Sequence, residues 1–261
     1  MRYFPQLETR TAGQYPLRRE RQERVVRHES LDGRLQKYYD SAARRVGWVL
    51  QYEGLTDAER AAVDALFAEC EGRLHGFVFL DPAANLLRWS EDFSQPVWTR
   101  DPALTLSGGW DDPWGTQRAT QILNSGAVSQ GLTQTIEASG HMHYCLSVYA
   151  GGGGRFRLRI EASGTVIEES FMAGADWARY TVSGRPGVEA ELVRFSLVVE
   201  AGEVVYAAGL QAEAQPAAGG YRRTTSRGGV YPEARFATDE LAWTQQAPNN
   251  NAAVIPIESR G

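Results

Sequence analysis

The spacing of apolar residues predicts a strand near residue 50. Between residues 46 and 52, large apolar side chains fill every second position, the period of a strand with one buried face. Upstream, the turn dipeptide Asp32-Gly33 separates two mixed runs and predicts a hairpin over about residues 23–38. The apolar positions of the predicted strand are Val46, Trp48, Leu50 and Tyr52.

A short helix should follow this strand. Thr56 is a favourable N-cap, and Glu59 three residues later completes the capping-box pattern. Gly72 stands where a glycine commonly ends a helix, which places the helix end at about residue 71. The apolar run 77–80 then predicts a short buried strand, which Asp81-Pro82 terminates. The helix face expected to be buried contains Ala62, Val63, Leu66, Phe67 and Cys70.

From residue 85 onward the pattern changes to short strand-like runs separated by Gly, Ser, Asn and Pro. About eight strands at this spacing predict a β-sandwich or jelly roll. Arginines alternate with apolar residues over 155–160, which predicts a strand with one solvent-facing side. Pro256 in the last apolar run, 253–257, predicts an edge strand. The predicted sandwich strands span residues 117–123, 131–137, 143–150, 155–161, 165–171, 178–183, 191–199 and 204–213.

Length and charge restrict the class of protein. We expect a mainly β chain with a small α/β domain, residues 1–84, followed by a β-sandwich, residues 85–235. Residues 1–45 are basic, but charges of both signs alternate there, which favours a protein surface over nucleic acid. The sequence contains no apolar stretch long enough to span a membrane, and residues 1–14 do not resemble a secretory signal.

The sequence shows no recognisable catalytic motif. It lacks a G-x-S-x-G nucleophile elbow, and the glycine run 151–154 is not followed by the Lys-Ser or Lys-Thr that binds nucleotide phosphates. We therefore expect no enzymatic activity and no required cofactor. Because two distant carboxylates could still converge across a cleft, a polysaccharide depolymerase stays open as an alternative.

Two tryptophans bracket an acidic turn. Trp110 and Trp114 flank Asp111-Asp112-Pro113 and precede a glycine. Exposed rings beside carboxylates suit sugar binding, because a ring offers an apolar face while carboxylates accept hydrogen bonds from hydroxyls. The predicted glycan site therefore consists of Trp110, Asp111, Asp112 and Trp114. The alternative is that the tryptophans close the open end of the sandwich.

The run Asn85–Ser94, with Trp98 after it, resembles the opening of a jelly-roll domain of phage tail and virion proteins. That domain is similar to carbohydrate-binding modules of the galactose-binding type. Residues 112–115 resemble its turn, and residues 209–214 and 221–226 resemble its closing strand, so the resemblance covers about residues 85–235. In this family a structural calcium is frequent near the terminal strands, where the candidate ligands are Glu91, Asp92 and Glu213.

Residues 48–52, the capped helix and residues 76–81 resemble the N-terminal hub domain of distal tail (Dit-like) proteins. Residues 236–261 look like a strand that returns to this domain. The resemblance implies a ring of six or three copies of the chain, in contact with tail-tube and baseplate hub proteins. Such a protein would belong to a virion tail, assembled in the bacterial cytoplasm and released by lysis.

Two hypotheses of function follow. The first is a structural tail protein, a distal tail or baseplate ring component of a phage or phage-like particle, whose sandwich also binds host glycan. The second is an adhesion module whose main role is to bind host cell-surface polysaccharide. Neither hypothesis involves nucleic acid or insertion into a membrane.

Overall fold

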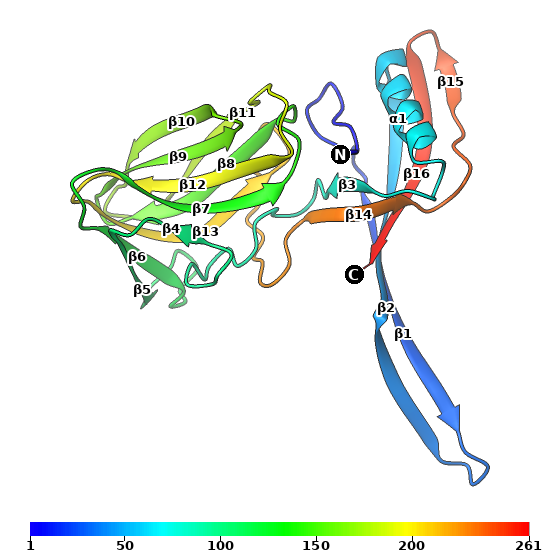
Figure 1. The fold of residues 1–261 in the computed structure, drawn as a ribbon, viewed down its shortest axis with the longest axis horizontal. Helices are drawn as coiled ribbons and strands as arrows, with labels where there is room; N and C mark the ends of the chain where they lie inside the picture. The colour runs from blue at the N-terminus through cyan, green and yellow to red at the C-terminus, as the bar shows by residue number, and fades with distance from the viewer. Residues whose placement is uncertain (261) are drawn as a thin grey trace. The chain divides into compact units, whose positions relative to one another are not determined.

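The structure is a computed structural model that describes residues 1–260 (Figure 1). The chain divides into two compact units. One, here called the terminal unit, contains Met1–Glu8, Gly13–Phe79 and the chain from Tyr231 onward. The other, here called the sandwich unit, contains Thr9–Ala12 and Leu80–Val230. These divisions lie a few residues before the predicted boundaries at 84 and 235.

The framework of the terminal unit is one six-stranded sheet. The sheet order is β1-β2-β16-β14-β3, and β15 also pairs with β16. The antiparallel pairing of β16 with β2 runs from Asn251 opposite Leu55 to Arg260 opposite Arg45, so the two ends of the sequence share one sheet. The strands are β1 Arg18–Glu29, β2 Leu35–Leu55, β3 Phe77–Leu80, β14 Val230–Phe236, β15 Thr244–Ala247 and β16 Asn250–Arg260.

The capped helix is confirmed as α1, Asp57–Glu69. The Thr56 hydroxyl accepts a hydrogen bond from the Glu59 amide at 3.2 Å, and the Glu59 carboxylate accepts one from the Thr56 amide at 2.8 Å. Both partners of the capping box are therefore in place, and they satisfy two amides that the first turn leaves open. Gly72 has φ +68°, the left-handed conformation expected just beyond a helix end.

Aromatic rings form the core of the terminal unit. Trp48 is 1% exposed, and its ring centroid lies 4.9 Å from that of Phe79 and 4.5 Å from that of Tyr231. Along β2, the buried positions 46, 48, 50 and 52 alternate with half-buried or exposed ones, so the period-two pattern read from the sequence corresponds to the buried face. Burying such rings is a main source of stability for a unit of this size.

The prediction that Pro256 confines its strand to an edge is wrong. Strand β16 lies between β2 and β14 in the sheet. The Pro256 carbonyl accepts a hydrogen bond from the Ala237 amide at 2.9 Å, just past the end of β14. The nitrogen and carbonyl of one residue point to the same side of a strand, so the missing N–H faces the end of β14. The ladder to β2 is therefore unbroken.

The hairpin formed by β1 and β2 is longer than predicted. The pairing extends from Glu29 opposite Leu35 to Arg18 opposite Val49, beyond the expected range 23–38. Because both runs carry charges on each face, the sequence pattern does not mark where the strands begin and end. Residues 18–45 are here called the arm, and their part beyond the pairing of β2 with β16, about residues 23–44, projects from the rest of the sheet (Figure 1). The exposed apolar residues of the arm are Val25, Leu31, Leu35, Tyr38 and Tyr39.

The sandwich unit consists of two five-stranded antiparallel sheets, and it confirms the predicted mainly β fold. Sheet I has the order β10-β9-β12-β7-β4, and sheet II has the order β11-β8-β13-β6-β5. Every predicted strand is present, and β4 and β5 are additional. The strands are β4 Thr99–Arg100, β5 Leu104–Trp110, β6 Ala119–Asn124, β7 Gln130–Glu137, β8 Tyr144–Gly151, β9 Arg155–Ala162, β10 Thr165–Met172, β11 Ala178–Gly184, β12 Leu192–Val199 and β13 Val204–Glu213.

The core of the sandwich comes from alternate residues of its strands. On β9, Phe156, Leu158 and Ile160 are fully buried, whereas Arg155 is exposed and Arg157 and Arg159 are half-buried. The buried and solvent-facing sides predicted for this strand are confirmed. The outward-facing positions of sheet I are thus free to build a surface, which positions the site described next.

Candidate functional site

The two predicted tryptophans lie against tyrosines of the sandwich unit. Trp110 is the last residue of β5 and not a loop residue, and its ring centroid is 5.0 Å from that of Tyr206. Trp114 follows in the turn and stacks on Tyr221 at 4.6 Å with an interplanar angle of 18°. Each indole is 41% exposed. Packing thus uses part of each ring, and a role of the exposed part in glycan binding stays a prediction.

Trp114 has a close backbone neighbour. Gly209 has φ +63°, and a Cβ at this position would lie 2.7 Å from the Trp114 ring. Glycine therefore serves two purposes here, because it adopts the left-handed conformation and leaves room for the indole. The contact ties the turn that carries Trp114 to strand β13.

The two predicted aspartates differ in their engagement. Asp111 is exposed, and its carboxylate lies 3.5 Å from the side-chain amide nitrogen of Gln117, a long and weak contact. Asp112 is buried, and its carboxylate accepts hydrogen bonds from the amides of Trp114 and Thr116, each at 2.9 Å. Burial alone would raise the pKa of Asp112, but the hydrogen bonds from Thr116 and Trp114 outweigh it and hold that pKa below the usual value. Asp112 therefore closes its own turn.

The three candidate calcium ligands are each engaged elsewhere. Glu91 forms an ion pair with Arg223 at 2.7 Å, and Asp92 accepts a hydrogen bond from the Ser94 hydroxyl at 2.6 Å. Glu213 is buried and accepts a hydrogen bond from the Gly219 amide at 3.0 Å. Residues 1–260 contain no group of three or more His, Cys, Asp or Glu side chains that could hold a metal ion. These three carboxylates are thus engaged with groups of the chain itself, and a calcium ion near the terminal strands of the sandwich stays a prediction.

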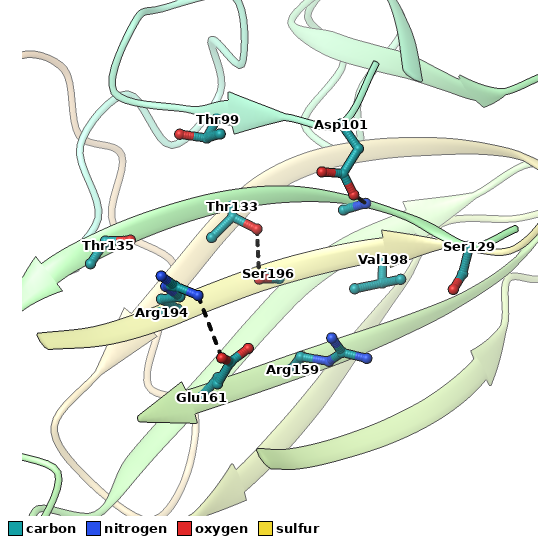
Figure 2. A pocket seen from close by; sticks show the side chains of 11 residues that line it. Thr99, Asp101, Ser129, Thr133, Thr135, Arg159, Glu161, Arg194, Ser196 and Val198 are labelled. Atoms are coloured by element: carbon teal, nitrogen blue, oxygen red, sulfur yellow. Dashed lines mark hydrogen bonds and ion pairs between the residues drawn. The ribbon is translucent and has the colours of Figure 1, made fainter. Parts of the chain in front are cut away.

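A polar groove lies on the outward side of sheet I (Figure 2), and neither predicted tryptophan is among its lining residues. Its volume is about 390 Å³, within the range of small-molecule sites. Strands β4, β7, β12 and β9 supply most of the lining. The lining residues are Thr99, Asp101, Ser129, Gly131, Thr133, Thr135, Arg159, Glu161, Arg194, Ser196 and Val198.

Strand register arranges the lining in rows that cross sheet I. In the middle row, Thr133 pairs with Thr99 on one side and with Ser196 on the other. Ser196 in turn pairs with Arg159. The Thr133 and Ser196 hydroxyl oxygens are 2.8 Å apart (Figure 2). This row therefore places three hydroxyl groups and a guanidinium side by side across four strands.

The two flanking rows differ in chemistry. In one, Arg194 lies opposite both Glu161 and Thr135, so a charged pair sits beside a hydroxyl. In the other, Val198 lies opposite Gly131. The Gly131 amide donates a hydrogen bond to the Asp101 carboxylate at 2.7 Å. Because Gly131 has no side chain, nothing from this position fills the groove beside the Asp101 carboxylate.

Carboxylates hold the groove arginines in place. Arg159 donates to Glu168 of β10 at 2.8 Å, and Arg157 donates to the same carboxylate at 3.1 Å. Burial alone would raise the pKa of Glu168, but the hydrogen bonds and charges of Arg159 and Arg157 keep it below its usual value. Glu161 contacts Arg194 at 3.5 Å, a longer and weaker interaction. These ion pairs fix the guanidinium groups of Arg159 and Arg194 independently of a ligand.

The sequence contained one signal of this groove that a residue-by-residue reading misses. Polar residues at 194 and 196 alternate with apolar ones at 193, 195 and 197, whereas Gln134 interrupts the same alternation between Thr133 and Thr135. Alternation tells which residues share one side of a strand, but not which strands become neighbours. Strands β7, β12 and β9 are adjacent in the sheet although they are not consecutive in the chain.

Comparisons with known proteins give a likeness of fold. No protein-family model matches the chain, and no curated protein sequence matches it. A solved xylan-binding domain of carbohydrate-binding module family 22 matches 53% of this chain and 99% of its own length, at 13% identity and a TM-score of 0.41. The module TmCBM61, solved in complex with β-1,4-galactotriose, matches 49% of this chain and 97% of its own, at 17% identity and a TM-score of 0.39.

A further match is the enzymatically active domain of tailspike protein 4 from bacteriophage CBA120. It covers 52% of this chain, at 13% identity and a TM-score of 0.40, but only 22% of the tailspike chain. These matches are likenesses at low identity and low TM-score, and the β-sandwich is established by the two five-stranded sheets of the chain itself. Within residues 1–260, no helix has the length and apolar character to cross a membrane.

Proposed function

We propose that the sandwich unit binds carbohydrate in the groove on the outward side of sheet I. The observation that carries the proposal is the row formed by Thr99, Thr133, Ser196 and Arg159, which presents hydroxyl and guanidinium groups from adjacent strands. A sugar ring carries several hydroxyls, each of which donates and accepts, so a row of mixed donors and acceptors is complementary to it. The likeness to carbohydrate-binding modules agrees with this proposal but does not identify a ligand.

The strand geometry suits a short oligosaccharide. Gly131, Thr133 and Thr135 line the groove at alternate positions of β7, so the lining extends roughly 13 Å along that strand. Across the sheet, four strands contribute at a spacing of roughly 4.8 Å each. Both directions exceed the size of a single sugar ring. Binding by hydrogen bonds over several rings is therefore sterically open.

The test is to fill the groove with a larger side chain and to compare the glycan affinity of that variant with that of a variant carrying the same substitution on sheet II. A Cβ at Gly131 meets only ordinary contacts at 3.5 Å and beyond, so Gly131→Val should fold while its side chain occupies the groove. Gly108 on β5 of sheet II has nothing within 4 Å and provides the control Gly108→Val. The full chain and both variants are applied to a panel of immobilised bacterial and plant polysaccharides, after their melting curves have been compared.

The proposal expects wild type and Gly108→Val to bind the same polysaccharides, with at least about a tenfold loss for Gly131→Val, or about 1.4 kcal/mol. Equal binding by all three proteins would place any carbohydrate site outside the groove. Failure of wild type to bind any member of a broad panel would count against carbohydrate binding altogether.

The arm supports a second candidate function, assembly with further copies of this chain. Its exposed apolar residues include Val25, Leu35 and Tyr39, which share one side of the ribbon. A two-stranded ribbon is marginally stable alone, and exposed apolar patches commonly mark protein interfaces. Residues 18–45 contain nine Lys and Arg against five Asp and Glu, whereas the whole chain carries a net charge of −5. The arm is thus complementary in charge to the remainder of another copy.

Sedimentation velocity of the full chain tests this candidate. We expect species larger than a monomer at low salt, and a shift to monomer in the double variant Val25→Ser/Tyr39→Ser. Val254 of β16 is likewise exposed, so Val254→Ser is the matched control and should still assemble. A wild-type protein that stays monomeric at all concentrations would contradict the candidate. A place for such an assembly in a virion tail, beside tail-tube and baseplate hub proteins, belongs to the same proposal.

A further inference from the structure

We infer that the ligand of the sheet I groove is a neutral glycan that binds mainly by donating hydrogen bonds from its hydroxyls, with Asp101 as the principal acceptor. This inference rests on the proposed carbohydrate-binding function. It adds the chemical class of the sugar, and it excludes uronate-, sulfate- and phosphate-bearing polymers as the preferred ligands.

The first argument is charge balance. The groove lining contains two arginines, Arg159 and Arg194, and two carboxylates, Asp101 and Glu161. Arg159 is further paired with Glu168 at 2.8 Å. The lining therefore offers no excess positive charge to attract an acidic polymer. An anionic sugar group would meet the Asp101 carboxylate at one end of the groove or the Glu161 carboxylate at the other, and like charges in a partly desolvated site repel.

The second argument is the balance of donors and acceptors. The guanidinium of Arg159 already donates to Glu168, and that of Arg194 donates to Glu161. A sugar carboxylate can only accept hydrogen bonds, so it would compete with Glu168 and Glu161 for guanidinium groups that already pair with them. Among the other lining groups, the Asp101 and Glu161 carboxylates can only accept, and the Ser and Thr hydroxyls both donate and accept. A hydroxyl-rich, uncharged ligand supplies the donors that these carboxylates need.

The third argument is the absence of a stacking platform. None of the residues that line the groove is aromatic. Recognition there cannot depend on packing a sugar face against a ring, and it must come from directed hydrogen bonds. Such recognition rewards a fixed pattern of hydroxyls and penalises a ligand that leaves buried acceptors unpaired.

Asp101 is placed to be the principal acceptor. One of its carboxylate oxygens accepts the Gly131 amide at 2.7 Å, which fixes the side chain. Figure 2 shows it at the Ser129 end of the groove, apart from the Arg194–Glu161 pair. Asp101 is exposed, so its second oxygen can be reached from solvent. A hydrogen bond from a sugar hydroxyl to an ionised carboxylate is among the stronger ones available in such a site.

The experiment compares neutral oligosaccharides with acidic counterparts of the same length and linkage on one array, using the full chain. Wild type, Asp101→Asn, Gly131→Val and the control Gly108→Val are measured at about 0.05 and about 0.5 M salt. Asp101→Asn keeps an acceptor for the Gly131 amide, so it should preserve the local fold while it removes the charge.

We expect groove-dependent binding to neutral members only, with an affinity that changes less than about twofold with salt, because no net charge is neutralised. Asp101→Asn should weaken that binding by about tenfold, the loss of one charge-assisted hydrogen bond. Binding to an acidic member that salt weakens and Gly131→Val abolishes would overturn the inference and leave the proposed function standing. The lack of any binding that depends on Gly131 would overturn both.

Discussion

The Thr133 hydroxyl contributes to the groove without contributing to the core. It is half-buried on β7, and its contact with the Ser196 hydroxyl is a single hydrogen bond on the outward side of sheet I. Thr133→Val keeps the side-chain shape and removes this polar group. We expect a loss in glycan affinity of roughly threefold to tenfold, because one ligand hydrogen bond is worth about 1 kcal/mol. Isothermal titration measures it.

Thr105 on β5 provides the matched control for this substitution. It is an exposed threonine at a strand position of sheet II, so Thr105→Val makes the same change in β-propensity away from the groove. Its affinity should equal that of wild type. Equal losses in both variants would show that the effect is a general one on the sandwich and not a groove contact.

At the residue scale, the sequence identified candidate binding residues that are neighbours in the chain. It missed those that only strand pairing brings together. Trp110 and Trp114 stand out because two indoles and two aspartates occupy five consecutive residues. Thr133 and Ser196 lie far apart in the chain, and only the pairing of β7 with β12 brings them together. A single sequence reports side-chain periodicity but not strand order, so this pair could not be predicted.

The capping box of α1 is the clearest device at the scale of an element. Thr56→Ala removes the oxygen that accepts the Glu59 amide at 3.2 Å. We expect the free energy of unfolding of the terminal unit to fall by about 1 kcal/mol. Thr56→Ser, which retains the oxygen, should lose much less. Urea denaturation followed by circular dichroism compares the two, and equal losses would contradict a capping role.

The pairing of β10 with β9 should weaken in acid. The pKa of Glu168 is lower in the folded chain than its ordinary value, so its ion pairs stabilise the fold above the unfolded-state pKa. That stability is lost across the acidic range in which the pH falls from the unfolded-state pKa through the lower folded-state pKa. Glu168→Gln should remove part of this acid dependence, whereas Glu169→Gln, at the next position of β10, should not. Thermal melts across this range measure both.

Elements with local signals were predicted well, and elements fixed by their neighbours were not. The helix depends on Thr56, Glu59 and Gly72, which lie within one short stretch of chain. Strand β5 was missed because Gly108 and Gly109 interrupt its pattern, and pairing with β6 holds it as a strand. The predicted edge position of β16 was wrong because the sequence shows that a proline is present but not which neighbouring strand its nitrogen faces.

At the scale of the whole molecule, the chain combines a terminal unit that contains both ends of the sequence with a sandwich unit in between. Local sequence patterns predicted the change near residue 85 from a helix-bearing segment to short strands separated by turns. The return of β16 to β2 could be expected only from resemblance, because a pairing of residues about 200 positions apart leaves no mark in periodicity. The groove belongs to the sandwich unit alone, so its binding can be mapped within that unit.

Amide chemical-shift mapping of the full chain during titration with a bound glycan tests the central claim most directly. The account predicts that the largest shifts fall on the amides of Gly131, Thr133 and Ser196, together with their neighbours across β7, β12 and β9. Shifts concentrated instead on Trp110, Trp114 and the strands of sheet II, with the groove amides unchanged, would contradict it.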